Sequence, residues 1–193
     1  MSTKIPLSFY LRDDVVCIAK DLLGKYIFTH IDHQLTGGII TETEAYAGTT
    51  DKASHAYDNR RTNRTEVMYH EGGVAYVYFC YGMHSLFNIV TNKKDIPHAI
   101  LIRAIKPTEG INTMLYRTQK KVVAKDFSNG PGKVCKALGI ECKNSGTDLR
   151  GNIIWLEDRK KIIPDSEIII GKRIGVDYAK EDALLPYRFR III

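Results

Sequence analysis

The chain has 193 residues, of which 44% are hydrophobic and 26% are charged, and this composition is typical of one globular domain, which we expect to span residues 1–193. No apolar run approaches the roughly 20 residues of a membrane span, and the N-terminus lacks the apolar core of a signal peptide, so we expect a cytoplasmic protein with no membrane partner. The net charge of +6 favours a polyanionic partner, although many basic proteins bind no nucleic acid.

The first predicted elements are a helix and a β-hairpin. Apolar residues at helical spacing, two opening acids and a closing glycine predict a helix over residues 13–24. Residues 25–30 are typical of a strand, and we expect 33–38 to form the turn into the β-prone run 38–46.

The middle of the chain predicts a long loop and a second hairpin. Residues 48–73 keep no apolar period and crowd polar, basic and aromatic side chains together, as in a functional loop. Residues 73–81 and 86–91 are predicted to pair as strands. The tip of this hairpin would hold Tyr81, Gly82, Met83 and His84.

The rest of the chain predicts further strands and two helices. A buried strand is expected over 99–105, ending before Pro107, and a helix is expected to open at Thr108-Glu109-Gly110. A short helix should follow over 134–138. Further strands are predicted at residues 153–156, 167–170 and 187–191.

The four cysteines carry no metal signature. They lie at positions 17, 80, 135 and 142, without the C-x-x-C spacing of a zinc site or a redox pair. We therefore expect reduced thiols and no bound metal.

Glu44 is the main candidate for chemistry. On alternating strand positions Ile40, Glu42, Glu44 and Tyr46 share one face. If that face is buried, Glu44 would be desolvated and could act as a general base near neutral pH. A solvated surface carboxylate is the commoner outcome for a glutamate on a strand.

Tyrosines gather on the second hairpin. Alternation puts Tyr76 and Tyr78 on one side, and Tyr81 is free to project from the tip once the turn has begun. Aromatic rings stack on bases for about 1–3 kcal/mol each. For Tyr76 we favour plain sheet packing, while for Tyr78 and Tyr81 both packing and base contact remain open.

The long loop offers polar candidates. His55 could donate to a ligand or merely tie its loop to the backbone. Arg60, Arg61 and Arg64 could grip phosphates or form a solvated basic loop.

Three further polar residues stand out by position. Arg103 interrupts an apolar strand, where a buried guanidinium needs an anionic partner such as Glu44 or a phosphate. Asn88 lies in a β-prone run and either reads a base edge or bonds the backbone. Lys133 follows a Gly-Pro-Gly loop at a helix start, which suits a phosphate contact, but a plain loop and cap is favoured on this feature alone.

Several motifs agree in order along nearly the whole chain. They are Glu44-Ala45-Tyr46, His55, Arg60-x-Thr62, Tyr76-Val77-Tyr78-x-x-Tyr81-Gly82-Met83, Asn88, Leu101-Ile102-Arg103-Ala104, Gly130-Pro131-x-Lys133, Arg173-Ile174-Gly175-Val176-Asp177-Tyr178 and Leu185-Pro186-Tyr187-Arg188-Phe189. Together they resemble the alkyladenine (3-methyladenine) DNA glycosylase family. The chain looks like a minimal, bacterial version, and His84 beside the expected wedge departs from the pattern.

The resemblance implies a role for each matched position. Glu44 would activate water for attack on the sugar C1′ of a flipped nucleotide, and Arg103 would support the water side of the pocket. Asn88 would screen against the exocyclic amine of guanine, and Tyr81 would be the wedge that replaces the flipped base. The base walls would be Tyr46, His55 and Tyr78, and the DNA contacts would include Met83, Lys133 and the arginines at 60, 61 and 64.

The resemblance also implies an architecture and a reaction. We expect an α+β fold, a single compact domain with a curved, mostly antiparallel β-sheet, flanking helices and a protruding β-hairpin. The protein would be a monomeric, monofunctional, nucleoid-associated glycosylase without metal or cofactor, and its partner would be double-stranded DNA containing an alkylated or deaminated purine. An alkylated purine is cationic, so electron-rich rings would attract it and its weakened bond would need little acid assistance.

Two other functions stay open from the residues. The same pocket could belong to a non-catalytic binder of damaged nucleic acid or to a hydrolase of small nucleosides. The hairpin and the basic loop argue against a nucleoside hydrolase, because neither would serve a small substrate.

Overall fold

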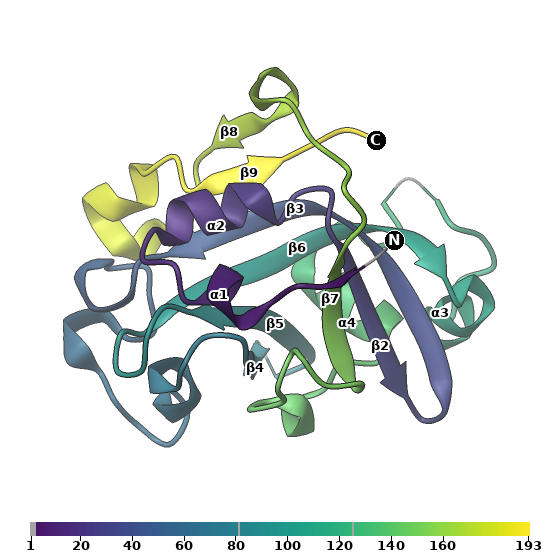
Figure 1. Cartoon of the computed structure of the whole chain (residues 1–193), viewed down its shortest axis with the longest axis horizontal. Helices are drawn as coiled ribbons and strands as arrows, with labels where there is room; N and C mark the ends of the chain where they lie inside the picture. The colour runs from purple at the N-terminus through teal and green to yellow at the C-terminus, as the bar shows by residue number, and fades with distance from the viewer. Residues whose placement is uncertain (1–2, 81, 125) are drawn as a thin grey trace.

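A long central strand, β3 (Gln34–Tyr46), organises the sheet of this computed structural model, which describes residues 3–80, 82–124 and 126–193 (Figure 1). Among them, the other strands are β1 (Thr3–Lys4), β2 (Tyr26–Ile31), β4 (Ala75–Cys80), β5 (His84–Thr91), β6 (His98–Glu109), β7 (Ile154–Asp158), β8 (Ile169–Gly171) and β9 (Arg188–Arg190). The α-helices are α1 (Leu7–Tyr10), α2 (Val15–Asp21), α3 (Ile111–Thr118) and α4 (Pro131–Leu138). Short 3-10 turns are η1 (Gly48–Thr50), η2 (Tyr57–Asn59), η3 (Glu66–Tyr69), η4 (Cys142–Asn144), η5 (Asp165–Glu167) and η6 (Asp177–Leu184).

The strands form an antiparallel sheet in the order β1-β7-β2-β3-β6-β5-β4. One edge of β3 divides between two neighbours, because β2 pairs with its first half and β9 pairs with residues Glu42 to Glu44. The other edge pairs with β6 along nearly its whole length. The ladder with β6 shifts register on both sides of Glu42, and such bulges bend a strand and re-aim its side chains.

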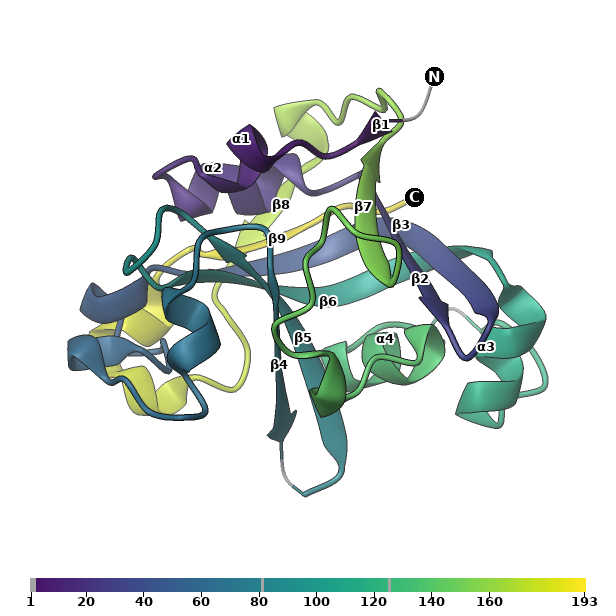
Figure 2. The same ribbon diagram turned by 60° about the horizontal axis from the view of Figure 1, so that its bottom comes forward.

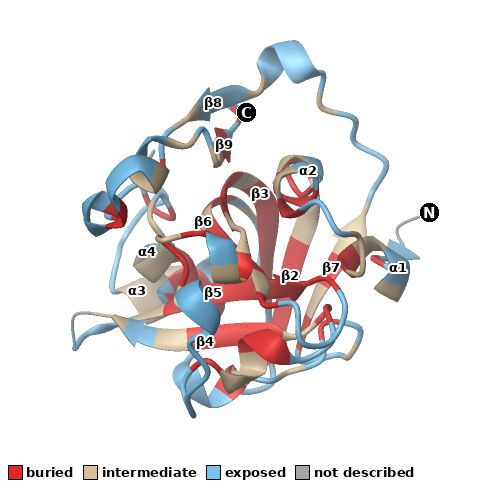
Figure 3. Cartoon of the chain, turned by 90° about the vertical axis from the view of Figure 1, so that its left-hand side faces the viewer, coloured by how far each residue is buried: buried red, intermediate tan, exposed pale blue. Residues whose placement is uncertain are grey.

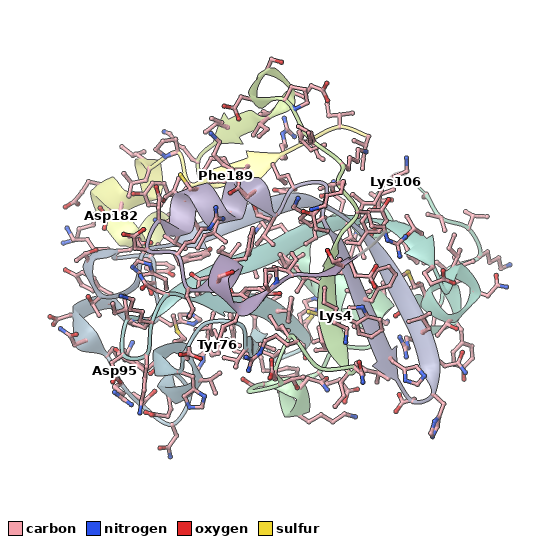
Figure 4. The ribbon with its side chains drawn as sticks, in the orientation of Figure 1. Lys4, Tyr76, Asp95, Lys106, Asp182 and Phe189 are labelled. Atoms are coloured by element: carbon pink, nitrogen blue, oxygen red, sulfur yellow. The ribbon has the colours of Figure 1, made fainter. Side chains whose placement is uncertain are left out.

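The main core lies where this sheet packs against its helices. The buried central strands are red in Figure 3, and α2 and α4 add apolar faces to the same cluster. A second cluster surrounds Tyr76, which Figure 4 labels. The hairpin of β4 and β5 extends away from the body in Figure 2. The predicted α+β fold, with a curled antiparallel sheet and a protruding hairpin, is confirmed.

The predicted turn over residues 33–38 is wrong. The turn is Asp32-His33, whose φ angles of 55° and 58° allow a two-residue hairpin connection, and β3 begins directly after it. Gly37 and Gly38 lie inside the strand because the chain there has no room for a side chain. A Cβ on Gly37 would lie 2.3 Å from the Phe28 ring.

Two other predicted boundaries are also wrong. The strand expected to stop before Pro107 continues as β6 to Glu109, and Pro107 pairs with Gly38. The next helix therefore starts later than expected, at Ile111, with Gly110 as its cap in the left-handed region. The helix predicted over residues 13–24 is present as α2. It begins after Asp14, whose carboxylate accepts the Cys17 N–H at 2.9 Å.

The cysteines, all of which lie in the described part of the chain, form no disulfides. All four cysteines are unpaired, and only Cys135 is buried. In the three ranges that the structure describes, no helix is both long enough and apolar enough to cross a membrane.

Candidate active site

Most of the predicted chemical residues meet at one cavity. Its volume is about 290 Å³, close to the lower end of the roughly 300–1,000 Å³ typical of small-molecule sites, which suits a single base. It lies between the end of β3, the hairpin strands, β6 and the segment before η6. Its lining includes Tyr46, His55, Tyr76, Tyr78, Asn88, Arg103, Ile174 and Tyr178.

Glu44 lies directly behind this lining. Its side chain is fully buried, which meets the condition that we set for a general base and differs from the solvated outcome that is commoner for a strand glutamate. One carboxylate oxygen accepts the Ile174 N–H at 2.8 Å. The other accepts the Tyr46 hydroxyl at 2.9 Å and an Arg103 Nη1–H at 3.3 Å. Glu44 is thus held by three donors that themselves line the cavity.

Opposing influences act on the pKa of Glu44. Burial is the largest influence and raises the pKa of Glu44 above its ordinary value, and the neighbouring Glu42 adds to the rise. The Arg103 charge is the strongest influence in the opposite direction, followed by the Ile174 N–H and the Tyr46 hydroxyl. The result is a desolvated carboxylate with a raised pKa, which is the property a general base needs.

Arg103 has the anionic partner that its sequence position demanded. Its Nε–H donates to Glu42 at 3.1 Å while Nη1 reaches Glu44, so one guanidinium bridges two buried carboxylates. Arg188 on β9 donates to the same Glu42 oxygen at 2.7 Å. The floor below the cavity therefore contains two acids and two guanidinium groups.

Aromatic side chains form one wall. The rings of Tyr76 and Tyr78 lie 5.4 Å apart, and His55 meets Tyr78 edge-on at 4.6 Å. His55 also hydrogen-bonds through Nδ1 to the Tyr76 hydroxyl at 2.9 Å, so it ties its loop to a side chain and lines the cavity as well. Tyr76 is almost fully buried, in agreement with the packing that we favoured.

His55 is neutral at neutral pH. Burial lowers its pKa to about 4, and the charges of Arg64 and Arg60 contribute to the lowering. An uncharged imidazole leaves the aromatic wall free of a positive charge that would repel a cationic base.

Asn88 lies opposite Tyr76 in the hairpin. It bonds the backbone, as one prediction had it, and it also lines the cavity, where the other prediction placed a contact with a base edge. Its side-chain amide donates to the Tyr76 carbonyl oxygen at 3.2 Å. The amide oxygen accepts no hydrogen bond from the described residues, although Asn88 lines the cavity. The backbone bond thus fixes the amide and leaves its oxygen available to a ligand.

A model of the family described as methylpurine-DNA glycosylase matches residues 8–192. The chain belongs to this family. A protein of Chlamydia abortus named "Putative 3-methyladenine DNA glycosylase" is 49% identical over 190 residues, which cover 98% of each chain. Proteins of the same name from Clostridium novyi and Bacillus cytotoxicus are 45% and 42% identical, and the alignments cover 95% and 96% of this chain and 92% and 95% of theirs.

This membership confirms the resemblance that the motifs showed. The chain is a DNA glycosylase, a hydrolase of N-glycosyl bonds that acts in base excision repair, and its substrate is DNA. The membership therefore favours a glycosylase over the two other functions that the residues left open. These relatives are bacterial.

The arginines predicted to contact DNA differ in whether an ion pair already holds them. Arg60 is exposed, and Arg64 is exposed with its guanidinium 5.0 Å from the centre of the Tyr78 ring. Arg61 is held by Glu66 at 2.7 Å and by Asp95 at 2.8 Å, so a phosphate contact would have to break both ion pairs.

The remaining DNA candidates lie on the hairpin and at α4. Met83 is largely exposed beside the hairpin tip, and Lys133 pairs with Asp126 at 2.7 Å on the surface. Tyr81, the predicted wedge, lies outside the residues that the structure describes. Met83 and Lys133 thus lie at the surface, where DNA could reach them.

Sequence reasoning missed three residues on the C-terminal side of the cavity, of which Ile174 and Tyr178 line it and Arg173 lies behind the lining. Arg173, Ile174 and Tyr178 belong to a motif that we matched without giving it any chemistry. Ile174 holds Glu44, Tyr178 lines the cavity with its hydroxyl on the Ala53 carbonyl at 3.0 Å, and Arg173 is completely buried in its side chain. The sequence carried no local signal for Arg173, because Lys172 precedes it and its partners on the far side of the chain lie 122 and 128 residues away.

Proposed function

We propose that this glycosylase flips an alkylated or deaminated purine out of duplex DNA into the cavity, where Glu44 activates the water that hydrolyses the N-glycosidic bond. The observation that carries the proposal is a fully buried carboxylate with a raised pKa, held by three donors behind an aromatic cavity of the size of one base. Such an environment is what general-base catalysis near neutral pH requires.

The reaction needs one proton transfer at Glu44. The water oxygen bonds to C1′, the bond from C1′ to the purine nitrogen breaks, and the purine leaves with that electron pair. Glu44 accepts the water proton. The contact between Glu44 and Arg103 is its longest hydrogen bond, so we infer that the water enters beside Arg103.

The walls favour a damaged purine for two reasons. Tyr46 and Tyr78 present rings to the cavity, and a cationic alkylated purine is attracted to such rings. Its positive charge also makes it a good leaving group, so neutral His55 need not donate a proton. Asn88 adds a steric screen, because an amide held by the Tyr76 carbonyl cannot move aside to make room for the exocyclic amine of guanine.

Flipping needs contacts outside the cavity. We assign phosphate contacts to Arg60, Arg64 and Lys133, and we assign Arg61 to the same surface only if its ion pairs open. Tyr81 is proposed as the wedge, with Met83 beside it at the hairpin tip. The protein is proposed to act as a monomer, since one chain supplies the whole cavity.

The test is Glu44→Gln. We expect release of the damaged base in a single turnover to fall by about 10² to 10⁴ while binding to the lesion duplex is kept, because only the general base is lost. Glu71→Gln is the matched control, since Glu71 is exposed and is not among the groups that shift the pKa of Glu44. A near wild-type rate for Glu44→Gln would remove Glu44 from the reaction. The same assay with methylated, deaminated and etheno-modified purines ranks the lesions.

A further inference from the structure

Arg173 joins four chain segments behind the cavity wall. Its side chain is fully buried. Nη1 donates to the Ala45 carbonyl oxygen at 2.9 Å, and Nη2 donates to the Asp182 carbonyl oxygen at 3.0 Å. Both nitrogens also reach the Asp51 carboxylate, at 2.5 and 2.8 Å. This two-pronged geometry is one that a guanidinium can provide and an ammonium cannot.

The flat face of Arg173 supports a cavity wall. The guanidinium lies 4.8 Å from the centre of the Tyr46 ring and 5.3 Å from that of Tyr187. Tyr46 lines the cavity and donates its hydroxyl to Glu44. Ile174, the residue that follows Arg173, donates its N–H to the other Glu44 oxygen. Arg173 therefore packs against one of the three donors that hold Glu44 and directly precedes another in the chain.

The Asp51 end of the pair orders a second part of the wall. Asp51 accepts the N–H groups of Ala47 and Ala53 at 3.0 Å each, and so fixes the loop that leads to His55. Arg173 and Asp51 thus connect the loop before His55 with the strand end that carries Tyr46. The side chains of Arg173 and Asp51 are both buried from solvent.

We propose that Arg173 is the positioning residue of the active site, and that its pair with Asp51 sets both the orientation of the Tyr46 wall and the charge balance around Glu44. The role rests on the proposed function of Glu44 as the base. Arg173 is absent from the cavity lining, so it acts through Tyr46, Ile174 and Asp51 and not on the substrate.

The charge balance predicts opposite effects for the two partners. The Arg173 cation interacts with Glu44, so removing it raises the pKa of Glu44 and moves the acidic limb of the rate profile to higher pH. Removing the Asp51 charge does the reverse, because the Arg173 cation then loses the anion that neutralises it. The other charged or titratable groups around Glu44 stay in place in both variants: Arg103, Glu42, Tyr46, Tyr78 and Arg188.

The experiment measures single-turnover base release from a methylated duplex against pH for Arg173→Met, Asp51→Asn and the double variant. We expect the acidic limb to move up by roughly 0.5 to 1 pH unit in Arg173→Met, down by a similar amount in Asp51→Asn, and back toward the wild-type position in the double variant. The double variant should still be about tenfold or more slower than wild type, because the contacts to Tyr46 and to the backbone are lost.

Arg173→Lys separates charge from shape. The lysine keeps the charge, so the limb should stay near its wild-type position, but it cannot stack and fork as the guanidinium does, so lesion affinity should fall several-fold. Arg159→Lys is the matched control. Arg159 also lies over two rings, those of Tyr26 and Phe28 on β2, at 4.4 and 4.9 Å, and it pairs with Glu157 on β7. None of these residues lines the cavity.

The outcomes are distinguishable. Equal loss of rate at every pH in Arg173→Met and Asp51→Asn, with no opposite movement of the limb, would overturn the positioning role and leave a purely structural one. If Arg173→Met does not fold, Asp51→Asn and Arg173→Lys still decide the question. An acidic limb that survives in Glu44→Gln would instead show that the limb belongs to another group, and the proposed function would fail first.

Discussion

Arg173 and Arg61 make the same kinds of contact in opposite environments. Arg173 pairs with Asp51 and lies over Tyr46, and Arg61 pairs with Glu66 and lies over Tyr69 at 4.6 Å. The side chain of Arg173 is 0% exposed, whereas that of Arg61 is 44% exposed. Water screens the second pair and leaves the first almost unscreened, so similar contacts should differ several-fold in their effect on stability.

The difference explains how charges are used around this cavity. Buried pairs hold the walls and the carboxylate in one geometry, because breaking them leaves an uncompensated charge in a medium of low dielectric constant. Exposed arginines can exchange one partner for another at small cost. The buried half of the site is thus suited to chemistry, and the exposed half is suited to binding a mobile polyanion.

The sharpest test of this contrast is the matched pair Arg173→Met and Arg61→Met. We expect Arg173→Met to lower the free energy of unfolding by about 3–5 kcal/mol, since Asp51 stays buried without its partner, and Arg61→Met to lower it far less, since water screens its ion pairs. Urea unfolding at neutral pH measures both. Equal losses would show that burial does not separate the two pairs.

Glu44 extends the contrast to pH. Because burial raises the pKa of Glu44, the folded state gains stability relative to the unfolded chain while the carboxyl is protonated, and it loses that gain as pH rises from the ordinary pKa of 4.5 through the raised one. Glu44→Gln has no such group. We therefore expect wild-type protein to lose stability relative to Glu44→Gln over this rise in pH, by about 1.4 kcal/mol for every pH unit that separates the folded and unfolded pKa of Glu44.

Unfolding free energies at a series of pH values test this expectation. Glu71→Gln provides the baseline for an exposed carboxylate. A difference between wild type and Glu44→Gln that does not change with pH would mean that the folded protein does not perturb Glu44.

His55 gives an effect of opposite sign. Its pKa is lowered to about 4, mainly by burial and then by Arg64 and Arg60. The unfolded chain therefore takes up a proton before the folded protein does, and stability is lost as pH falls from about 6.5 toward 4. An NMR titration of the His55 ring should show a midpoint near 4, and Arg64→Ala should raise it. A midpoint near 6.5 would place His55 in solvent.

The sequence predicted the Arg103 contact but could not predict the Arg173 cluster. A lone guanidinium in an apolar strand requires an acid within reach, and Glu44 was the acid in a neighbouring strand. The partners of Arg173 lie 122 and 128 residues away, and no local pattern connects positions that distant. Such pairs become visible only when the sheet has brought β3 and the C-terminal segment together.

Two glycines led to the wrong turn for a related reason. The pair Gly37-Gly38 is typical of a turn, but here the glycines allow the Phe28 ring and the β6 backbone to approach β3. Asp32 and His33 form the turn instead, in a left-handed conformation for which their residue types are less typical than glycine. Local propensity therefore located the hairpin, while tertiary packing decided its register.

The smallest effect concerns DNA binding by the exposed arginines. If Arg60 and Arg64 contact phosphates, Arg60→Ala and Arg64→Ala should each lower the slope of log affinity against log salt by roughly 1, for lesion and undamaged duplex alike. Arg61 is already neutralised by Glu66 and Asp95, so Arg61→Ala should leave the slope nearly unchanged. Binding measured by fluorescence anisotropy at several salt concentrations distinguishes these cases. A full unit lost in Arg61→Ala would show that its ion pairs open on DNA, and the exposed half of the site would then reorganise on binding while the Arg173 side stays fixed.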